Sequence, residues 1–142
     1  MKNTKVLLST IWIFLTVNFI FCDVFTLMYS EDLQQILNGK AGEIELTQEF
    51  LLLFAIIMEI SMMMIVLSRL LTYKLNRILN LIFGLILVLV QLGSLLADDN
   101  SLHYIFFSII EVTALLCIVW LAWHWKNNQV QSENKPIMQS YA

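Results

Sequence analysis

Four long apolar segments follow one another along the chain, separated by short polar stretches. They cover about residues 6–28, 49–71, 78–96 and 102–125. At about 1.5 Å of rise per residue, a helix over the second segment is roughly 35 Å long, which is enough to cross a bilayer. The pattern predicts an all-α membrane protein, with a four-helix transmembrane bundle in residues 1–126. The polar tail that follows, residues 127–142, is expected to be disordered.

The connection between the first two segments carries signals for local structure. Ser30 is placed to cap a short helix over residues 31–37, which Gly39 would end. Residues 43–46 alternate between polar and apolar positions, as in a short extended piece. Thr47 is a candidate N-cap for the second membrane helix. We therefore expect a structured loop between helices 1 and 2.

The other two connections are shorter. Residues 72–77 form a positively charged connection between the second and third segments. Asp98, Asp99 and Asn100 make a tight acidic turn before the fourth segment, which Asn100 or Ser101 would cap.

The distribution of basic residues predicts how the bundle is oriented. They gather at the N-terminus, in the second connection and after the fourth segment: Lys2, Lys5, Arg69, Lys74, Arg77 and Lys126. The first and third connections are acidic and contain a single Lys40. Because cytoplasmic loops carry the excess of Lys and Arg, both termini should face the cytoplasm, with Arg69, Lys74 and Arg77 at that interface.

Composition supports a membrane protein and excludes several other classes. The chain is 59% hydrophobic and 13% charged, whereas soluble domains carry about 25% charged residues. A net charge of −3 without a basic cluster argues against nucleic acid as a partner.

Cys22 and Cys117 lie at different depths, so we expect no disulfide between them. His103 and His124 lie roughly 31 Å apart on one helix and do not share a metal or haem. No motif calls for a cofactor.

Each apolar segment carries a polar side chain at membrane depth. These are Asn18, Glu59, Gln91 and Glu111 in the first to fourth segments. Without water, such groups are expected to turn inward and meet. Asp23 lies nearer the outer surface, about 140° around the first helix from Asn18, and is expected to reach water.

Two helical stripes support an inward polar face. The third segment has Asn80, Gly84, Leu87, Gln91 and Ser94 at helical spacing, and the fourth has Tyr104, Ser108, Glu111, Leu115, Ile118 and Ala122. We therefore expect Glu59 and Glu111 to line one interior cavity. The candidate residues for binding a ligand or a proton are Asn18, Asp23, Glu59, Gln91, Tyr104 and Glu111.

Two glutamates in a low dielectric do not both ionise easily, so at least one is expected to be protonated at neutral pH. Such a pair can carry a proton, bind a cationic ligand or hydrogen-bond a neutral one. In the other interpretation, each glutamate is a protonated acid that bonds to Asn18, Gln91 or Tyr104 and holds the helices in register.

Several stretches of the chain resemble a family of uncharacterised bacterial four-helix membrane proteins, itself distantly similar to DoxX-like proteins. They are NFIFCDVF (18–25), NGKAGEIELTQEFLL (38–52), MEI with SRLL after it (58–71), and LHYIFFSIIE (102–111) followed by WLAWHW (120–125). The resemblance implies a four-span protein of the bacterial inner membrane and no established activity. The positions that match the family's recurring polar residues are Asp23, Glu59, Arg69, Asn76, Arg77, His103 and Glu111. The family has a proline shortly after the glutamate of the second helix, whereas this chain has Ser61.

These observations favour a small protein of the bilayer with a polar cavity around Glu59 and Glu111. We expect the cavity to bind a small or lipophilic ligand, or to exchange protons, without enzymatic activity. The first alternative is a structural or accessory subunit of a larger membrane complex. A small proton-coupled exporter is the second, although its essential carboxylate would usually lie in the first helix. A membrane enzyme such as an isomerase, with the glutamates as acid and base, is the third. A homodimer also fits, since so small a bundle has lipid-facing surface to spare.

Overall fold

The structure is a computed structural model that describes residues 2–42, 44–96 and 100–126. It contains the helices α1 (Lys2–Met28), α2 (Ser30–Leu37), α3 (Gln48–Leu70), α4 (Tyr73–Leu96) and α5 (Leu102–His124). A small antiparallel hairpin of β1 (Lys40–Ala41) and β2 (Ile44–Glu45) joins α2 to α3, with Lys40 opposite Glu45. Glu43, the predicted turn at Asp98 and Asp99, and the predicted tail over 127–142 lie outside the described residues.

Four of these helices have the length and composition of membrane spans. They are α1, α3, α4 and α5, each with 23 to 27 residues and a strongly apolar sequence. A helix of 23 residues is about 35 Å long, enough for the hydrocarbon core of a bilayer. The structure thus supports a multi-pass membrane protein with four candidate spans, as the hydrophobic pattern predicted.

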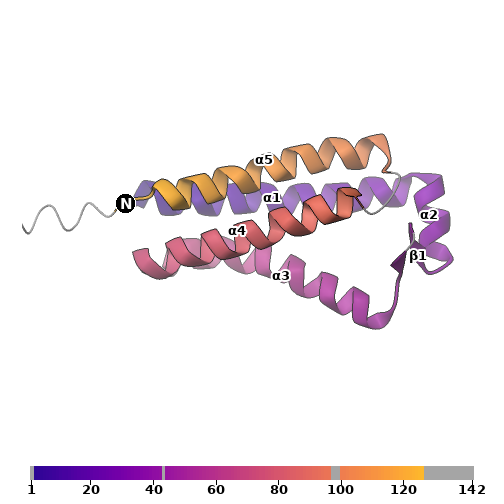
Figure 1. Ribbon diagram of the computed structural model, residues 1–142, viewed down its shortest axis with the longest axis horizontal. Coiled ribbons are helices and arrows are strands. Elements are labelled where there is room, and N and C mark those ends of the chain that lie inside the picture. Colours follow the sequence, from indigo (N-terminus) through magenta and orange to yellow (C-terminus); the bar gives the residue numbers. More distant parts are fainter. Residues whose placement is uncertain (1, 43, 97–99, 127–142) are drawn as a thin grey trace, which may run out of the picture.

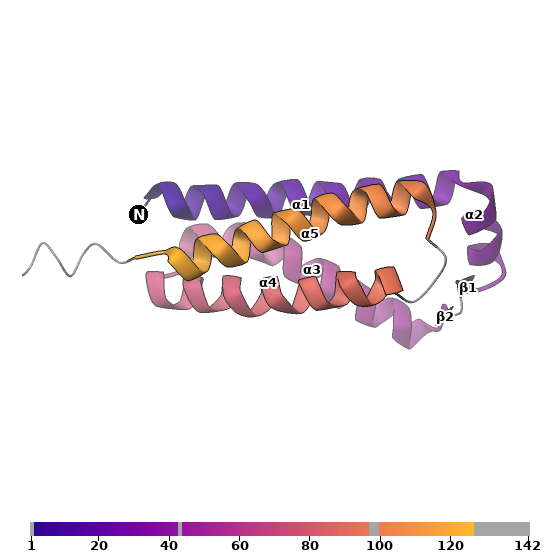
Figure 2. The same cartoon turned by 45° about the horizontal axis from the view of Figure 1, so that its top comes forward.

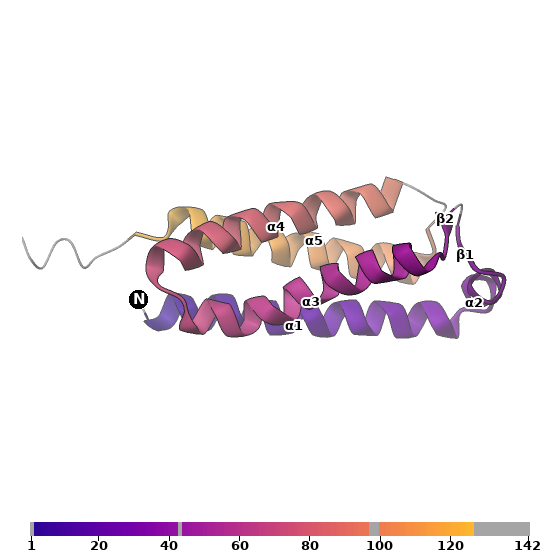
Figure 3. The ribbon, with the colours of Figure 1, turned by 90° about the horizontal axis from the view of Figure 1, so that it is seen from below.

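The four long helices run side by side, with both ends of the described chain at one end of the bundle (Figure 1). The helix α2 and the hairpin lie at the opposite end, here called the α2 end (Figure 2). Helix α4 packs on α5, α5 on α1 and α1 on α3, whereas the consecutive helices α3 and α4 touch much less. Helix α3 leans away from α4 toward the α2 end (Figure 1), and in the same direction it also separates from α1 (Figure 3). The bundle is therefore closed at the terminal end and looser at the α2 end.

Two of the predicted boundaries differ in the structure, and the predicted cap of α3 is confirmed. Helix α4 begins at Tyr73 rather than at residue 78, so most of the predicted connection is helical. Packing explains this, because Asn76 is fully buried and donates a hydrogen bond to the carbonyl oxygen of Ser68 in α3. The N-cap of α2 is Tyr29 instead of Ser30, without a side-chain capping bond. Thr47 does cap α3, since its hydroxyl accepts from the backbone N–H of Phe50 at 3.2 Å.

A buried polar cluster joins three helices near the terminal end. Trp12 of α1 donates through Nε1 to Asn80 Oδ1 of α4 at 2.7 Å. Asn80 Nδ2 donates to Asn76 Oδ1 at 2.7 Å, and Ser68 of α3 lies within 3.5 Å of Asn80. All four side chains are fully buried. Since buried polar groups need partners, this cluster fixes how α1, α3 and α4 fit together.

Basic side chains tie the helix ends together at the same end of the bundle. Lys5 donates to the carbonyl oxygen of Leu71, and Arg77 donates to that of Trp123 at 3.1 Å. Arg69 Nε donates to the Ser9 hydroxyl at 3.0 Å. These bonds hold three cations at the terminal end, remote from the α2 end.

Candidate functional site

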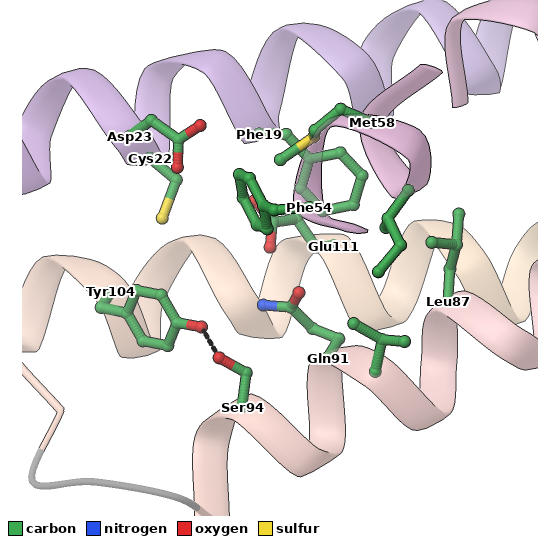
Figure 4. Close-up of a pocket in the computed structure, with 12 residues that line it drawn as sticks. Phe19, Cys22, Asp23, Phe54, Met58, Leu87, Gln91, Ser94, Tyr104 and Glu111 are labelled. Atoms are coloured by element: carbon green, nitrogen blue, oxygen red, sulfur yellow. Dashed lines mark hydrogen bonds between the residues drawn. The ribbon is translucent and has the colours of Figure 1, made fainter. Parts of the chain in front are cut away.

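A cavity of about 110 Å³ lies in the half of the bundle nearer the α2 end, where α3 and α4 diverge. All four long helices contribute side chains to it (Figure 4). Its apolar lining consists of Phe19, Phe54, Ile57, Met58, Leu87 and Val90. Its remaining lining consists of Cys22, Asp23, Gln91, Ser94, Tyr104 and Glu111. We call this space the central cavity; one wall is apolar and the other carries hydrogen-bonding groups.

Glu111 is the most deeply placed acidic group of the central cavity. It lies on α5, about 14 Å along the helix from Leu102, and its side chain is only 1% exposed. Its atom Oε1 is buried and has no hydrogen-bond partner in the described part of the chain. A buried carboxyl oxygen without a donor costs free energy in either protonation state. The described residues thus leave this buried oxygen without a hydrogen-bond donor.

The neighbouring polar side chains already bond to each other. Gln91 Nε2 donates to the Ser108 hydroxyl at 2.8 Å, which links α4 to α5. The hydroxyls of Ser94 and Tyr104 share a second hydrogen bond between the same two helices (Figure 4). The predicted stripes of α4 and α5 thus face each other, and these bonds leave Glu111 Oε1 without a donor.

Asp23 connects the central cavity to a second space at the α2 end. This second space, the vestibule, has a volume of about 190 Å³ and shares Asp23, Ser94 and Tyr104 with the central cavity. Its other lining residues include Asp32, Gln35 and Ile36 of α2. Asp23 is exposed on α1. The two spaces adjoin at these three shared residues, and we call the pair, which extends from the α2 end to Glu111, the path.

The expectation that Glu59 and Glu111 line one cavity is wrong. Glu59 is exposed on the outer surface of α3 and lines neither the central cavity nor the vestibule. The buried side chains of α3 are Ser61, Met64 and Ser68, at intervals of three and four residues. Because each residue turns about 100° around a helix, Glu59 lies about 160° away from Ser61. It therefore points out of the bundle.

Asn18 is the second predicted site residue that the structure places elsewhere. It is half-buried, and its atom Oδ1 is buried without a partner among the residues that the structure describes. The cavity face of α1 instead carries Phe19, Cys22 and Asp23, which have the spacing of one helical face. Asn18 lies about 100° from Phe19 and so does not reach Gln91 or Glu111.

His103 attaches α2 to the end of the bundle. Its Nε2 lies 3.9 Å from Asp32 Oδ2 of α2 and 3.4 Å from the hydroxyl of Thr26. The ring of Tyr29 meets the imidazole edge-on, with 5.9 Å between the ring centres. The hydrogen bond from the Tyr29 hydroxyl to Glu31, aided by the charge of Glu31, raises the pKa of Tyr29. His103 thus holds α2 over the vestibule.

Sequence reasoning missed the apolar half of the site. Phe54, Ile57 and Met58 of α3 and Phe19 of α1 form that half together with Leu87 and Val90 of α4. The signal was present in the spacing, since Phe54, Ile57 and Met58 lie on one helical face. In an all-apolar helix, however, nothing distinguishes the residues that line a cavity from those that face lipid.

The thiols and the possible metal ligands have simple environments. Cys22 is buried beside the central cavity, Cys117 is exposed, and both are free thiols, as expected. In residues 2–42, 44–96 and 100–126, no group of three His, Cys, Asp or Glu side chains is arranged to hold a metal ion. The groups available for chemistry at the central cavity are therefore carboxyl, amide, hydroxyl and thiol.

Comparison with known proteins gives a family and no activity. The model of a family of unknown function (DUF6326) matches residues 1–132. No curated protein and no solved structure matches the chain. The family match agrees with the resemblance to an uncharacterised family and says nothing of bacterial origin or of DoxX-like proteins. The chemistry of the cavity must be derived from its own residues.

Proposed function

Because the chain belongs to this family of unknown function, we propose its role from the cavity itself: it is a four-span protein of the bacterial inner membrane that binds a lipophilic small molecule. The observation that carries the proposal is Glu111, a buried carboxyl with an oxygen that no described protein group satisfies. A purely structural acid would be expected to bond across helices, as Asn76 does to Ser68 of α3 and Asn80 does to Trp12 of α1.

The lining of the central cavity supports a ligand with a large apolar part. Six apolar side chains from α1, α3 and α4 form one wall, with aromatic rings from Phe19 and Phe54. Ligand sites are usually apolar pockets with a few well-placed polar groups, which fix the orientation of the ligand. Here those groups are Glu111, Asp23 and Gln91.

The charges at the two ends support an orientation with both termini in the cytoplasm. Lys5, Arg69 and Arg77 bond to backbone or hydroxyl oxygens at the terminal end. The α2 end carries Glu31 and Asp32 on its short helix. By the positive-inside rule, the terminal end is cytoplasmic, and the vestibule opens to the outside.

Photolabelling tests ligand binding, with a neutral octyl alcohol that carries a diazirine as the probe. The purified full chain is labelled in neutral-detergent micelles, and the modified residues are mapped by peptide mass spectrometry. We expect labelling at the α3 lining residues Phe54 and Met58 that excess n-octanol competes away. Labelling at Glu59, on the outer surface, should persist at any octanol concentration because the micelle supplies the probe there.

Two phenylalanine variants control this experiment. Val90→Phe places a larger side chain in the central cavity, whereas Leu89→Phe changes a 69% exposed neighbour that does not line it. The labelling that excess n-octanol displaces should disappear in Val90→Phe and persist in Leu89→Phe. Labelling that octanol never displaces from the wild-type cavity residues, or that is equal in both variants, would overturn the proposed function.

A second function, that of an accessory subunit, is favoured by one observation. Glu59 is exposed on the outer surface of α3, in the middle of a candidate span, next to the exposed residues Met62 and Met63. A carboxyl group that faces lipid is costly. A partner protein or a second copy of the chain that covers this face would remove that cost.

A further inference from the structure

We infer that the ligand of the central cavity is a lipophilic cation, an amine or a related ammonium group on an apolar body. The inference rests on the proposed function, because it specifies the chemical class that the same cavity accepts. It is drawn from the charges that line the path, from the hydrogen bonds already made there and from the positions of the protein's own cations.

The path from the vestibule to the central cavity is acidic. Asp32 and Asp23 line the vestibule, and Asp23 and Glu111 line the central cavity. In the described part of the chain, no Lys, Arg or His side chain lines either space. Clefts lined by one sign of charge attract ligands of the opposite sign, more strongly where the surroundings exclude water.

Among the residues that the structure describes, no Lys, Arg or His side chain forms an ion pair with Glu111. The nearest imidazole, that of His103 on α5, already contacts Asp32 of α2, Thr26 of α1 and the ring of Tyr29. The cations Lys5, Arg69 and Arg77 all bond at the terminal end. A carboxylate that is 99% buried needs a paired charge or a proton. A ligand that arrives through the vestibule can bring that charge.

An ammonium group also matches the hydrogen-bonding groups. It presents up to three N–H donors and no acceptor. Glu111 Oε1 has no donor, because Gln91 Nε2 bonds to Ser108 and the hydroxyls of Ser94 and Tyr104 bond to each other. The site therefore offers a buried acceptor that an N–H donor of a ligand can satisfy. An anionic or acceptor-only head group would gain little there.

Three competitors with the same chain length separate the head-group classes. They are n-octylamine, n-octanol and n-octanoate, each titrated at pH 7 over the same range of concentrations in the micelle phase. Competition is measured as the loss of the photolabel at Phe54 and Met58. We expect octylamine to compete at a concentration at least tenfold lower than octanol, and octanoate to be the weakest of the three.

The outcomes distinguish this inference from the proposed function. If octanol competes as well as octylamine, the cavity binds lipophilic molecules but does not select a cation, and the inference is overturned alone. If octanoate competes best, the inference is also overturned. If none of the three displaces the label, the proposed function fails as well.

Variants locate the charge that selects the amine. Glu111→Gln keeps the shape of the side chain but does not ionise, so the tenfold advantage of octylamine should be lost. Asp23→Asn tests the same point on α1 and remains informative if Glu111→Gln does not fold. Glu59→Gln removes a carboxyl of the outer surface and should keep the full advantage. Selectivity that survives in both cavity variants would place its origin elsewhere and overturn the inference.

Discussion

Trp12 and Asn80 come from the first and third long helices and meet through a 2.7 Å hydrogen bond, with both side chains completely buried. The bond lies at the terminal end, where α1, α3 and α4 converge. On the other side of Asn80, the amide group donates to Asn76. The amide is thus held from two sides, and the terminal end is the rigid part of the bundle.

Trp12→Phe should therefore destabilise the protein. The change removes the donor and leaves Asn80 Oδ1 with the 3.5 Å contact to Ser68 alone, at a cost of about 1–2 kcal/mol. Unfolding of the purified protein in mixed micelles, followed by circular dichroism, measures the difference. Trp123→Phe is the matched control, because its side chain is 64% exposed and should tolerate the change. Equal effects of the two substitutions would contradict a special role for the buried bond.

Gly84 permits a close contact between α4 and α5. A Cβ atom at this position would lie 2.8 Å from Cγ2 of Val119, closer than real Cβ atoms approach their neighbours. Gly84→Ala is expected to force the helices apart and to lower the free energy of unfolding by about 1–3 kcal/mol. Gly93→Ala on the same helix should be neutral or stabilising, because nothing lies within 4 Å of the added atom.

A double substitution checks the cause of the Gly84 effect. In Gly84→Ala with Val119→Ala, the clashing methyl group is absent, and most of the lost stability should return relative to Val119→Ala alone. The same unfolding measurement applies. No recovery would mean that the cost arises from the backbone of α4 and not from the contact with α5.

The four candidate spans and the polar stripes of α4 and α5 were predictable from the sequence. Each stripe follows one helical face and contains several polar side chains of its segment, so the inward face is defined by the contrast with the apolar neighbours. In the structure, the two stripes meet through the hydrogen bond from Gln91 to Ser108. The contrast works because an unpaired polar group in lipid is costly.

The same contrast failed on α3. The charged residue near its middle, Glu59, points outward, while its inner face is marked by the weakly polar Ser61 and Ser68. Ser61 forms a 2.7 Å hydrogen bond with Thr16 of α1, and Ser68 joins the cluster around Asn80. Small hydroxyl residues permit close packing of helices in membranes, and they were better guides to the inner face than the charge. The cavity opens where α3 diverges from α4. This divergence depends on how the helices pack together, and the residue pattern within one segment does not predict it.

His103 should control how firmly α2 covers the vestibule. None of the α2 side chains is buried, and His103 contacts Asp32 of α2 together with Thr26 and Tyr29, which precede this helix. In His103→Ala, we expect the amide protons of α2 to exchange about five to tenfold faster, equivalent to roughly 1 kcal/mol of local stability. Hydrogen exchange followed by mass spectrometry measures this change by segment.

His124→Ala is the control for this prediction. His124 is exposed at the other end of α5 and bonds within its own helix, to the carbonyl oxygen of Trp120. Its replacement should leave exchange in α2 unchanged. If both variants loosen α2 equally, the effect comes from α5 as a whole and not from the His103 contacts.

Glu59 gives the prediction that separates a single bundle from a subunit of a larger assembly. Its carboxyl group makes no hydrogen bond or ion pair with another residue of the described chain, and its neighbours Met62 and Met63 are exposed apolar side chains. For an isolated bundle, Glu59→Leu removes a group that lipid tolerates poorly, and the free energy of unfolding should rise by about 1 kcal/mol or more. Unfolding in micelles and the mass of the protein particle, from light scattering, are measured together.

A partner protein or a second copy that covers this face predicts the reverse: the variant loses stability and the particle loses mass. The first result supports a ligand-binding protein that works alone, because the incomplete polar environment then belongs to Glu111 inside the bundle. The second supports the accessory subunit, with Glu59 as the residue that its partner satisfies.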